Sequence, residues 1–242
     1  MPMKKLISVL LLLVLCLSIC ACGQDQTIST ENPGTEPTQQ TQPQKLELEV
    51  GQIYDFGQYE QDGNSDTTEA ISWQVLAVED GKALLISQYA LDVQLFHTDW
   101  SNTSWENCTM RTWLNKDFWN NAFTPEEQAR VLTTTVIADS NSEYTSDPGN
   151  DTQDKVFLLS IQEVLTLMPE KDSRKCQGTE YAKSCDLWLS EDGYCNWWLR
   201  TPGQNESYTC VVWSSGGIDT EGCYVIYGDK GVRPVIWLNL DN

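Results

Sequence analysis

The sequence predicts an α+β domain over residues 46–242, preceded by a leader and a polar linker. Three observations support this fold class. Two β-rich runs flank an acidic turn with glycine early in the domain, as in a β hairpin. Two helix-start signals, at residues 124–127 and 160–163, follow in the middle. Short apolar runs separated by turn residues fill the last third and indicate strands.

The leader, residues 1–21, has the parts of a secretory signal peptide. It begins with Lys4 and Lys5 and continues as a leucine-rich run. This run is shorter than the ~20 residues that span a bilayer. A cationic start, a short apolar core and a small residue before the cut define a signal peptide.

Cys22 is the predicted first residue of the mature chain. Ala21 precedes it and Ile19 lies three positions before it, which is typical of a bacterial lipobox, so we expect Cys22 to be lipidated. Cys20 is a poorer acceptor because the bulky Ile19 precedes it. We therefore expect a lipid anchor on the extracellular face of a Gram-positive cell membrane. Ordinary secretion with cleavage near Ala21 is the alternative.

Residues 22–45 are predicted to form a stalk between the anchor and the domain. They are rich in Gln, Thr, Pro and Glu and contain no aromatic residue. Such a segment buries too little apolar surface to offset its ordering entropy, so we expect disorder. Its prolines stiffen it towards an extended spacer.

The charge of the chain excludes one class of partner. It carries 35 acidic and 15 basic residues, a formal net charge of −20. Nucleic-acid binding requires clusters of Lys and Arg that neutralise phosphates, and these are missing. We expect no nucleic-acid partner.

The strands are predicted from alternation and from β-rich composition. The hairpin pairs 71–78 with 83–87 through Glu79-Asp80-Gly81. The other expected strands are 46–54, 131–137, 156–159, 197–200, 209–213, 223–227 and 232–240, with a turn at 214–217.

Three helices are expected between the strands. The first follows Asn107 as N-cap and extends to about Phe118. The other two begin with capping boxes and extend to about residues 130 and 168. The stretch 139–154 is predicted to be a polar loop.

Tryptophan is unusually frequent in the domain, which contains all ten of the chain. A tryptophan can be a large core residue with a polar handle, or an exposed platform for the apolar face of a sugar ring. The core role is favoured for any one of them, but ten make one or two exposed ones expected. We consider Trp100, Trp105 and Trp213 possible ligand-binding residues.

Three arginines lie beside tryptophans or a proline: Arg111, Arg200 and Arg233. Such side chains can clamp a carboxylate ligand, which makes Arg200 a further possible ligand-binding residue. The favoured alternative is that they pair with Asp or Glu and order the β-rich end.

No catalytic arrangement is recognisable. His97 is the only histidine, and no Gly-x-Ser-x-Gly turn presents a nucleophile. Paired carboxylates remain possible as hydrolase groups, but an acidic surface supplies such pairs by chance. We expect a protein that is not an enzyme.

The domain contains six cysteines: Cys108, Cys176, Cys185, Cys195, Cys210 and Cys223. An even number in an exported protein favours disulfides, so we expect at least one. Cys210–Cys223 would close the late hairpin and Cys176–Cys185 a local loop. Buried free thiols are the alternative.

Calcium is a weak candidate cofactor. Asp147, Asn150, Asp151 and Asp154 gather in one loop, and calcium takes hard oxygen ligands. The spacing is not that of an EF-hand, and a solvated acidic loop is the favoured interpretation. We therefore assign no metal or other cofactor.

An ordered set of short motifs in this sequence resembles a bacterial family known as domain of unknown function 6273. The set comprises Asp55-Phe56-Gly57-Gln58-Tyr59, Ile71-Ser72-Trp73-Gln74-Val75-Leu76, Leu84-Leu85-Ile86-Ser87, Arg111-Thr112-Trp113-Leu114-Asn115, Asp154-Lys155-Val156-Phe157-Leu158-Leu159-Ser160, Trp197-Trp198-Leu199-Arg200-Thr201-Pro202-Gly203 and Gly231-Val232-Arg233-Pro234-Val235. The family occurs on secreted and lipid-anchored proteins, and the resemblance implies no activity. The element order also resembles a C-type-lectin-like domain, which implies paired first and last strands and a late sheet with long loops.

These observations together predict a cell-surface lipoprotein with one C-type-lectin-like domain on a stalk. Its expected role is non-catalytic recognition or adhesion, with a glycan or a surface protein as partner. A structural or assembly role in the cell envelope is the alternative, and a hydrolase comes third. The likeness to lectins is weak support for sugar binding, because function depends on the site rather than the fold.

Overall fold

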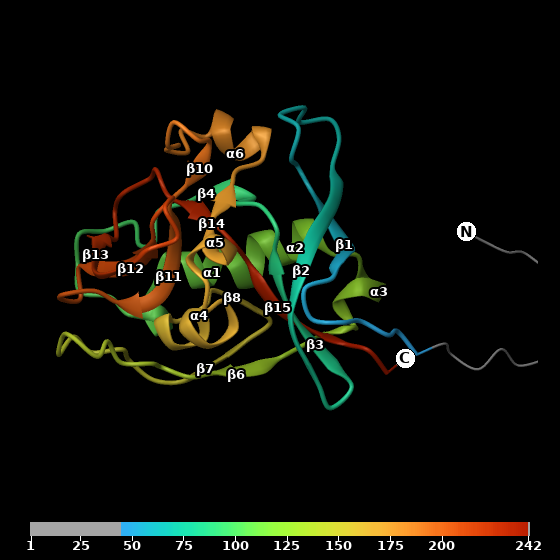
Figure 1. The fold of residues 1–242 in the computed structure, drawn as a ribbon, viewed down its shortest axis with the longest axis horizontal. Helices are drawn as coiled ribbons and strands as arrows, with labels where there is room; N and C mark the ends of the chain where they lie inside the picture. The colour runs from blue at the N-terminus through green and yellow to red at the C-terminus, as the bar shows by residue number, and fades with distance from the viewer. Residues whose placement is uncertain (1–44, 242) are drawn as a thin grey trace, which may run out of the picture. The chain divides into compact units, whose positions relative to one another are not determined.

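Two sheets organise residues 45–241, the part of the chain that the computed structural model describes (Figure 1). The predicted α+β class is confirmed, with about 19% helix and 35% strand. The predicted signal peptide lies outside the described residues, and so does the predicted stalk except for Lys45. Within the described part, no helix is both long enough and apolar enough to cross a membrane.

The first sheet contains the predicted hairpin. Its order is β1 (Ile53–Tyr59), β2 (Glu69–Glu79), β3 (Lys82–Ser87), β15 (Val235–Asn239) and β5 (Val131–Leu132), and β8 (Val156–Phe157) also pairs with β15. All these pairs are antiparallel. The β2–β3 turn places Asp80 and Gly81 at φ of 45° and 74°. Asp-Gly suits such a turn because both positions need positive φ.

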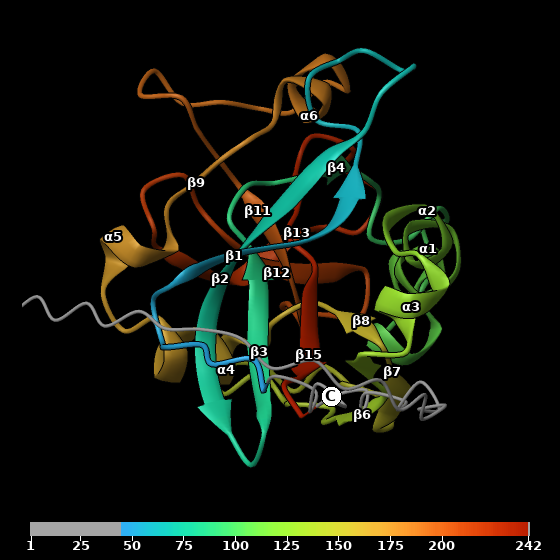
Figure 2. The ribbon, with the colours of Figure 1, turned by 90° about the vertical axis from the view of Figure 1, so that its right-hand side faces the viewer.

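The second sheet collects the late strands. Its order is β13 (Ile218–Tyr224), β12 (Tyr208–Val212), β11 (Trp197–Pro202), β14 (Gly231–Val232) and β4 (Asp92–Val93). The predicted strand 232–240 is divided at Pro234, so β14 belongs to this sheet and β15 to the first. Proline has no N–H to donate to a ladder. One chain segment thus joins both sheets (Figures 1 and 2).

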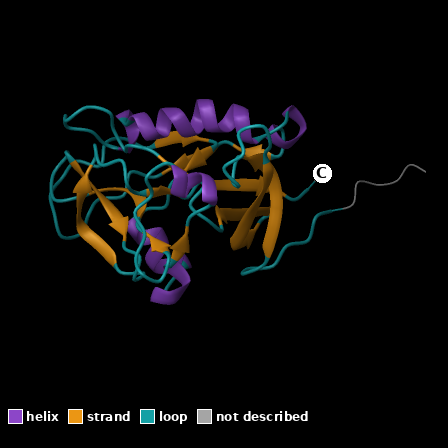
Figure 3. Cartoon of the chain, turned by 90° about the horizontal axis from the view of Figure 1, so that it is seen from above, coloured by secondary structure: helices purple, strands orange, loops and turns teal. Residues whose placement is uncertain are grey.

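A run of helix lies along one side of the strands (Figures 1 and 3). It comprises α1 (Thr109–Trp113), a π-helical turn (Leu114–Phe118) and α2 (Trp119–Ala122). The predicted helix is confirmed, but its N-cap is Cys108, whose sulfur accepts a hydrogen bond from the Arg111 N–H. Both predicted capping boxes are present, at α3 (Pro125–Gln128) and α4 (Ile161–Leu167).

Several short elements were not predicted. These are the 3₁₀ turn Trp105–Asn107, α5 (Lys171–Arg174), α6 (Glu180–Ser184) and the two-stranded pair of β9 (Cys176–Gln177) with β10 (Tyr194–Cys195). A further pair joins β6 (Thr134–Val136) to β7 (Thr152–Asp154).

Three predicted strands have other bounds. The strand expected at 46–54 begins at Ile53, because Gly51 forms a turn with φ of 88°. The strand expected at 131–137 is divided into β5 and β6. The strand expected at 223–227 lies mostly earlier in the chain and ends at Tyr224.

The first and last strands do not pair, although the lectin-like resemblance implies it. β1 pairs with β2, and β15 pairs with β3, β5 and β8. The two ends of the described region still meet, because the Leu46 N–H donates to the Leu240 carbonyl at 3.2 Å.

The core contains half of the tryptophans. Trp73, Trp105, Trp119, Trp197 and Trp198 are buried. Their indole groups find partners inside the protein: Trp73 donates to the Phe56 carbonyl at 2.7 Å and Trp198 to the Gln94 carbonyl at 3.0 Å. The core role that composition favours for most tryptophans is therefore correct for these five.

Candidate functional site

Four aromatic side chains form a cluster at the surface, which we call the aromatic platform: Trp100, Tyr208, Tyr224 and Tyr227. Tyr224 is central, with its ring centroid 4.5 Å from that of Trp100, 4.2 Å from Tyr208 and 5.3 Å from Tyr227. Trp100 is 60% exposed and Tyr227 is 45% exposed. The platform is thus an ordered apolar surface that faces solvent.

The edge of the second sheet positions this platform. Tyr208 and Tyr224 are cross-strand partners on β12 and β13. No residue of β13 is fully buried. Two backbone hydrogen bonds hold the Trp100 loop against this edge: the His97 N–H donates to the Val225 carbonyl at 3.0 Å, and the Thr103 N–H donates to the Glu206 carbonyl at 2.9 Å.

The two cross-strand tyrosines also interact through their hydroxyl groups. The hydrogen bond between them raises the pKa of the Tyr208 phenol to about 12. The Tyr208 phenol therefore stays neutral at physiological pH.

A polar hollow of about 260 Å³ shares the Trp100 loop. Its lining consists of small, amide and acidic residues: Asn102, Thr103, Ser104, Glu106, Asn107, Asp147, Gly149, Asn150 and Glu206. Glu106 fixes one wall, since its Oε2 accepts hydrogen bonds from the Asn150 N–H at 3.1 Å and side-chain amide at 3.0 Å. Asn102 lies two positions after Trp100, and Glu206 two positions before Tyr208.

An aromatic surface beside oriented amides and carboxylates suits a polyhydroxylated ligand. The rings contact C–H faces, while the polar side chains exchange hydrogen bonds with hydroxyl groups. Ligand sites generally combine apolar contact area with a few polar groups that fix orientation.

The four residues predicted to bind ligand lie in different parts of the structure. Trp100 belongs to the platform. Trp213 is 37% exposed but lies at the turn end of the β12–β13 hairpin, whereas Tyr208 and Tyr224 lie at its open end. Trp105 and Arg200 are 3% and 4% exposed, so these two side chains lie in the interior and do not belong to the platform.

Both buried residues have structural partners instead. Trp105 donates its indole N–H to Asp154 at 2.9 Å. Arg200 forms ion pairs with Glu163 and Asp139, and its Nη1 donates to the Leu158 carbonyl at 2.8 Å. The expected pairing of the arginines with acidic residues is therefore present for Arg111 and Arg200, whereas Arg233 forms no ion pair with an acidic side chain in the described part of the chain.

The tyrosines of the platform were missed at the sequence level. The signal that could have found them is symmetry about the predicted 214–217 turn. Tyr208 precedes that turn by nearly as many residues as Tyr224 follows it. An antiparallel hairpin places such positions opposite each other.

His97 does not face an activated nucleophile. It is half-buried, and its Nδ1 accepts a hydrogen bond from the Thr109 N–H at 3.3 Å. Cys108 directly precedes Thr109 in the chain, but burial raises the pKa of its thiol to about 12. A thiol with that pKa stays protonated at neutral pH and is a poor nucleophile.

The four calcium candidates do not act as one group. Asp154 is buried and accepts hydrogen bonds from Arg111, Trp105 and Thr152. Asp151 accepts from the Ala138 N–H at 2.8 Å and Asp147 from the Gly149 N–H at 2.9 Å, while Asn150 bonds to Glu106. Each of the four therefore has its own structural partner.

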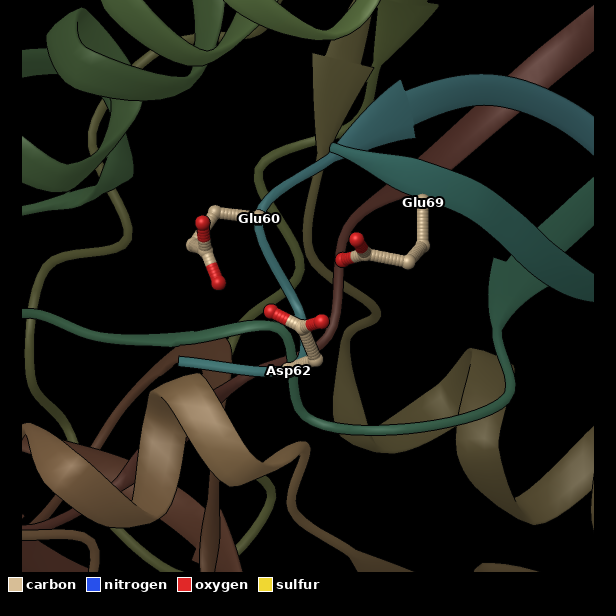
Figure 4. Close-up of side chains that lie close together, drawn as sticks. All are labelled: Glu60, Asp62 and Glu69. Carbon is tan, nitrogen blue, oxygen red and sulfur yellow. The ribbon is translucent and has the colours of Figure 1, made fainter. Parts of the chain in front are cut away.

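A different acidic cluster consists of Glu60, Asp62 and Glu69 (Figure 4), whose oxygens lie within 4.8 Å of one another. Oxygen ligands of this kind are those that a hard divalent cation takes. Each carboxylate already accepts a backbone N–H, from Gly63, Asn64 and Gln61 in that order. These hydrogen bonds give the three carboxylates a structural role, because they order the turn between β1 and β2.

The six cysteines between 45 and 241 are free thiols in this structure. The two pairings that seemed possible, Cys176–Cys185 and Cys210–Cys223, are not formed. Cys223 pairs in register with Thr209 rather than with Cys210, and the Cys210 thiol contacts the Thr220 carbonyl at 3.5 Å. The predicted disulfide is thus not observed.

The fold and the site define a mixed α+β domain with an aromatic platform on the edge of one sheet. Residues 80–240 match the family described as domain of unknown function, DUF6273. Because this match spans more than half of the chain, the protein belongs to the DUF6273 family, as the motifs predict. Neither a curated protein nor a solved structure matches the chain.

Proposed function

We propose that this chain is a cell-surface lipoprotein whose domain binds a glycan without transforming it, through the aromatic platform. One observation carries the proposal: Trp100 is 60% exposed, packs its ring against Tyr224 with centroids 4.5 Å apart, and lies on a loop that also lines the polar hollow. The ligand class is a neutral or hydroxyl-rich sugar chain.

The exposure of the platform supports a binding role. A large aromatic side chain left in water forgoes the ~25 cal/mol per Å² that burial of apolar surface contributes. Ordered aromatic groups gathered at the surface often mark interaction sites. Packing of the rings against one another and the backbone hydrogen bonds of the Trp100 loop hold these groups in place before any ligand arrives, which lowers the entropy lost on binding.

The charge distribution supports a neutral ligand. Carboxylates of Glu106, Asp147 and Glu206 line the hollow, and no Lys or Arg lines it. These carboxylates accept hydrogen bonds from hydroxyl or acetamido groups and repel phosphate or sulfate. A nucleic-acid ligand is disfavoured for the same reason.

The proposal includes the location and the fold subtype. The lipobox at Cys22, the signal peptide 1–21 and the polar segment 22–45 support a lipid anchor with a stalk. The late sheet of β11 to β14, and the meeting of Leu46 with Leu240, support a variant of the C-type-lectin-like fold. In this variant a hairpin separates the first strand from the last.

The test is a glycan array probed with the full chain, followed by titration of any hit. Trp100→Ala should weaken the hit at least tenfold, about 1.4 kcal/mol. Trp213→Ala is the matched control, because it removes an exposed tryptophan away from the platform and should leave affinity within about twofold. Both variants should keep the wild-type Tm.

Three results would contradict the proposal. They are no binding to any glycan on the array, equal losses of affinity in the two variants, and release of a product from a bound glycan. Absence of glycan binding would instead favour a protein partner or a structural role in the cell envelope. Product release would move it to a hydrolase.

A further inference from the structure

Cys176 and Cys195 lie directly opposite each other. They are register partners in the short antiparallel pair of β9 and β10. Both are buried, at 2% and 0% exposure. Directly opposed positions of an antiparallel pair bring Cβ atoms to about 4.5–5.5 Å, close to the separation that a disulfide needs.

A buried arginine without a carboxylate partner stands beside this pair. Arg233 is 2% exposed and packs its guanidinium 4.9 Å from the centre of the Trp197 ring. Its Nε and Nη2 donate to the Ser87 carbonyl, but Nη1 has no hydrogen-bond partner. Among residues 45–241, no acidic side chain forms an ion pair with it, in contrast to Arg200.

An unpaired buried cation is unfavourable unless a negative group compensates it. Burial alone would raise the pKa of the Cys176 thiol, but the hydrogen bond with Cys195 and the charge of Arg233 lower it to about 7. The same hydrogen bond raises the pKa of Cys195. The two sulfur atoms thus interact beside an uncompensated positive charge, and the Cys176 Sγ also contacts the Gln88 and Gln177 carbonyl oxygens at 3.7 and 3.3 Å.

We propose that Cys176 and Cys195 form a redox-active dithiol site, which a small organic disulfide or a disulfide-carrying oxidase converts to an intramolecular disulfide. The thiolate of Cys176 attacks one sulfur of the oxidant and releases one thiolate of it. The sulfur of Cys195 then attacks the Cys176 sulfur of the mixed disulfide and releases the second. The dithiol gives up two electrons and two protons, and the oxidant becomes two thiols.

The bond would close the segment between the two strands. That segment, 177–194, contains α6 and the exposed Trp188, and β10 leads directly into β11 of the second sheet. Closing a loop of this length stabilises a protein mainly by restricting the unfolded chain. For a domain of this size the expected gain is a Tm about 6 to 12 °C higher.

The experiment equilibrates the full chain in glutathione and glutathione disulfide, both in the native state and during refolding from urea. Remaining thiols are alkylated and the linked peptides identified by mass. We expect a single linkage, Cys176–Cys195, with the Tm increase given above. The Cys195→Ser variant should stop at one glutathione on Cys176.

The Cys210→Ser variant is the matched control, since Cys210 is buried on a strand outside the pair. It should form the same linkage and show the same increase in Tm. The proposal is overturned if all six thiols stay free under both conditions, if Cys176 pairs with Cys185, or if Cys210 pairs with Cys223. An oxidised protein with an unchanged or lower Tm would overturn the stabilising role of the bond.

Discussion

In the first sheet, Trp73 is fully buried and its ring packs 6.3 Å from that of Phe123, whereas in the second sheet Tyr208 and Tyr224 meet at the surface. Trp73 lies on β2, which has a strand on each side. Tyr224 lies on β13, an edge strand with no residue fully buried. Aromatic residues of similar size therefore serve the core in one sheet and form the platform in the other.

The difference shows that strand position decides how an aromatic residue is used. A central strand beneath a layer of helix is covered on one face and flanked on both sides. An edge strand keeps open hydrogen-bonding groups and open side chains, which makes it a place for ligands or partners. Composition alone cannot separate these two uses.

The largest expected effect is the loss of stability when the buried Trp73 is replaced. Trp73→Ala should reduce the free energy of unfolding by about 3–5 kcal/mol, because it leaves a large cavity and an unpaired Phe56 carbonyl. Trp100→Ala should change it by less than about 0.5 kcal/mol. Urea denaturation measures both. Similar losses in the two variants would show that the platform is part of the core.

A second test concerns the buried ion pairs of the second sheet. Arg200→Ala should reduce the free energy of unfolding by about 3 kcal/mol, because Glu163 and Asp139 lose their buried cation. Lys45→Ala removes the exposed pair with Asp241 and should change it by under about 0.5 kcal/mol. Urea denaturation at neutral pH provides the comparison. A neutral effect of the Arg200 change would contradict the structural role assigned to that residue.

The third prediction concerns the contact between the two sheets. The Tyr59 hydroxyl on β1 donates to Asp92 on β4 at 2.5 Å. Burial raises the pKa of Asp92, although hydrogen bonds from Tyr59, Val93 and Gln94 act in the opposite direction. The folded protein thus binds this proton more tightly than the unfolded chain does.

The stability that this group contributes is therefore complete below pH of about 4 and is lost as the pH rises through the folded-state pKa. Asp92→Asn should gain stability relative to the wild type as the pH rises above about 4, because the amide cannot ionise and the buried carboxyl can. Thermal unfolding at pH values from about 4 to 7 measures the difference. A constant difference at all pH values would show that Asp92 does not titrate there.

The smallest expected effects come from the two capping boxes. Ser160 is buried and caps α4, while Thr124 caps α3 in an exposed position. Ser160→Ala should reduce the free energy of unfolding by about 1–2 kcal/mol and Thr124→Ala by about 0.5–1 kcal/mol. Equal values would show that burial adds nothing to the cap.

Local signals predicted much of the fold. The Asp80-Gly81 turn and the two capping boxes specify their backbone conformations within a few residues, so the hairpin, α3 and α4 are confirmed. The pairing of β9 with β10 joins residues nearly twenty positions apart and has no local signal. The division of the last strand was missed, although Pro234, which has no N–H to donate to a ladder, is a local signal for such a break.

The candidate site was predictable only in part. Trp100 stands in a polar loop, and that context favours exposure. Trp105 lies in the same stretch but is buried, and its indole N–H donates a hydrogen bond to the buried carboxylate of Asp154. The contribution of Tyr224 depends on the register of β12 with β13, and a bulge between Thr209 and Val211 alters that register.

The division of the last strand also has a consequence for synthesis. β14 provides a central strand of one sheet, and β15 a central strand of the other, only two residues later. A ribosome makes Gly231–Asn239 after every other strand of either sheet. Neither sheet can therefore be completed on the nascent chain until this segment has emerged, and the domain must fold as a whole after most of it has been translated.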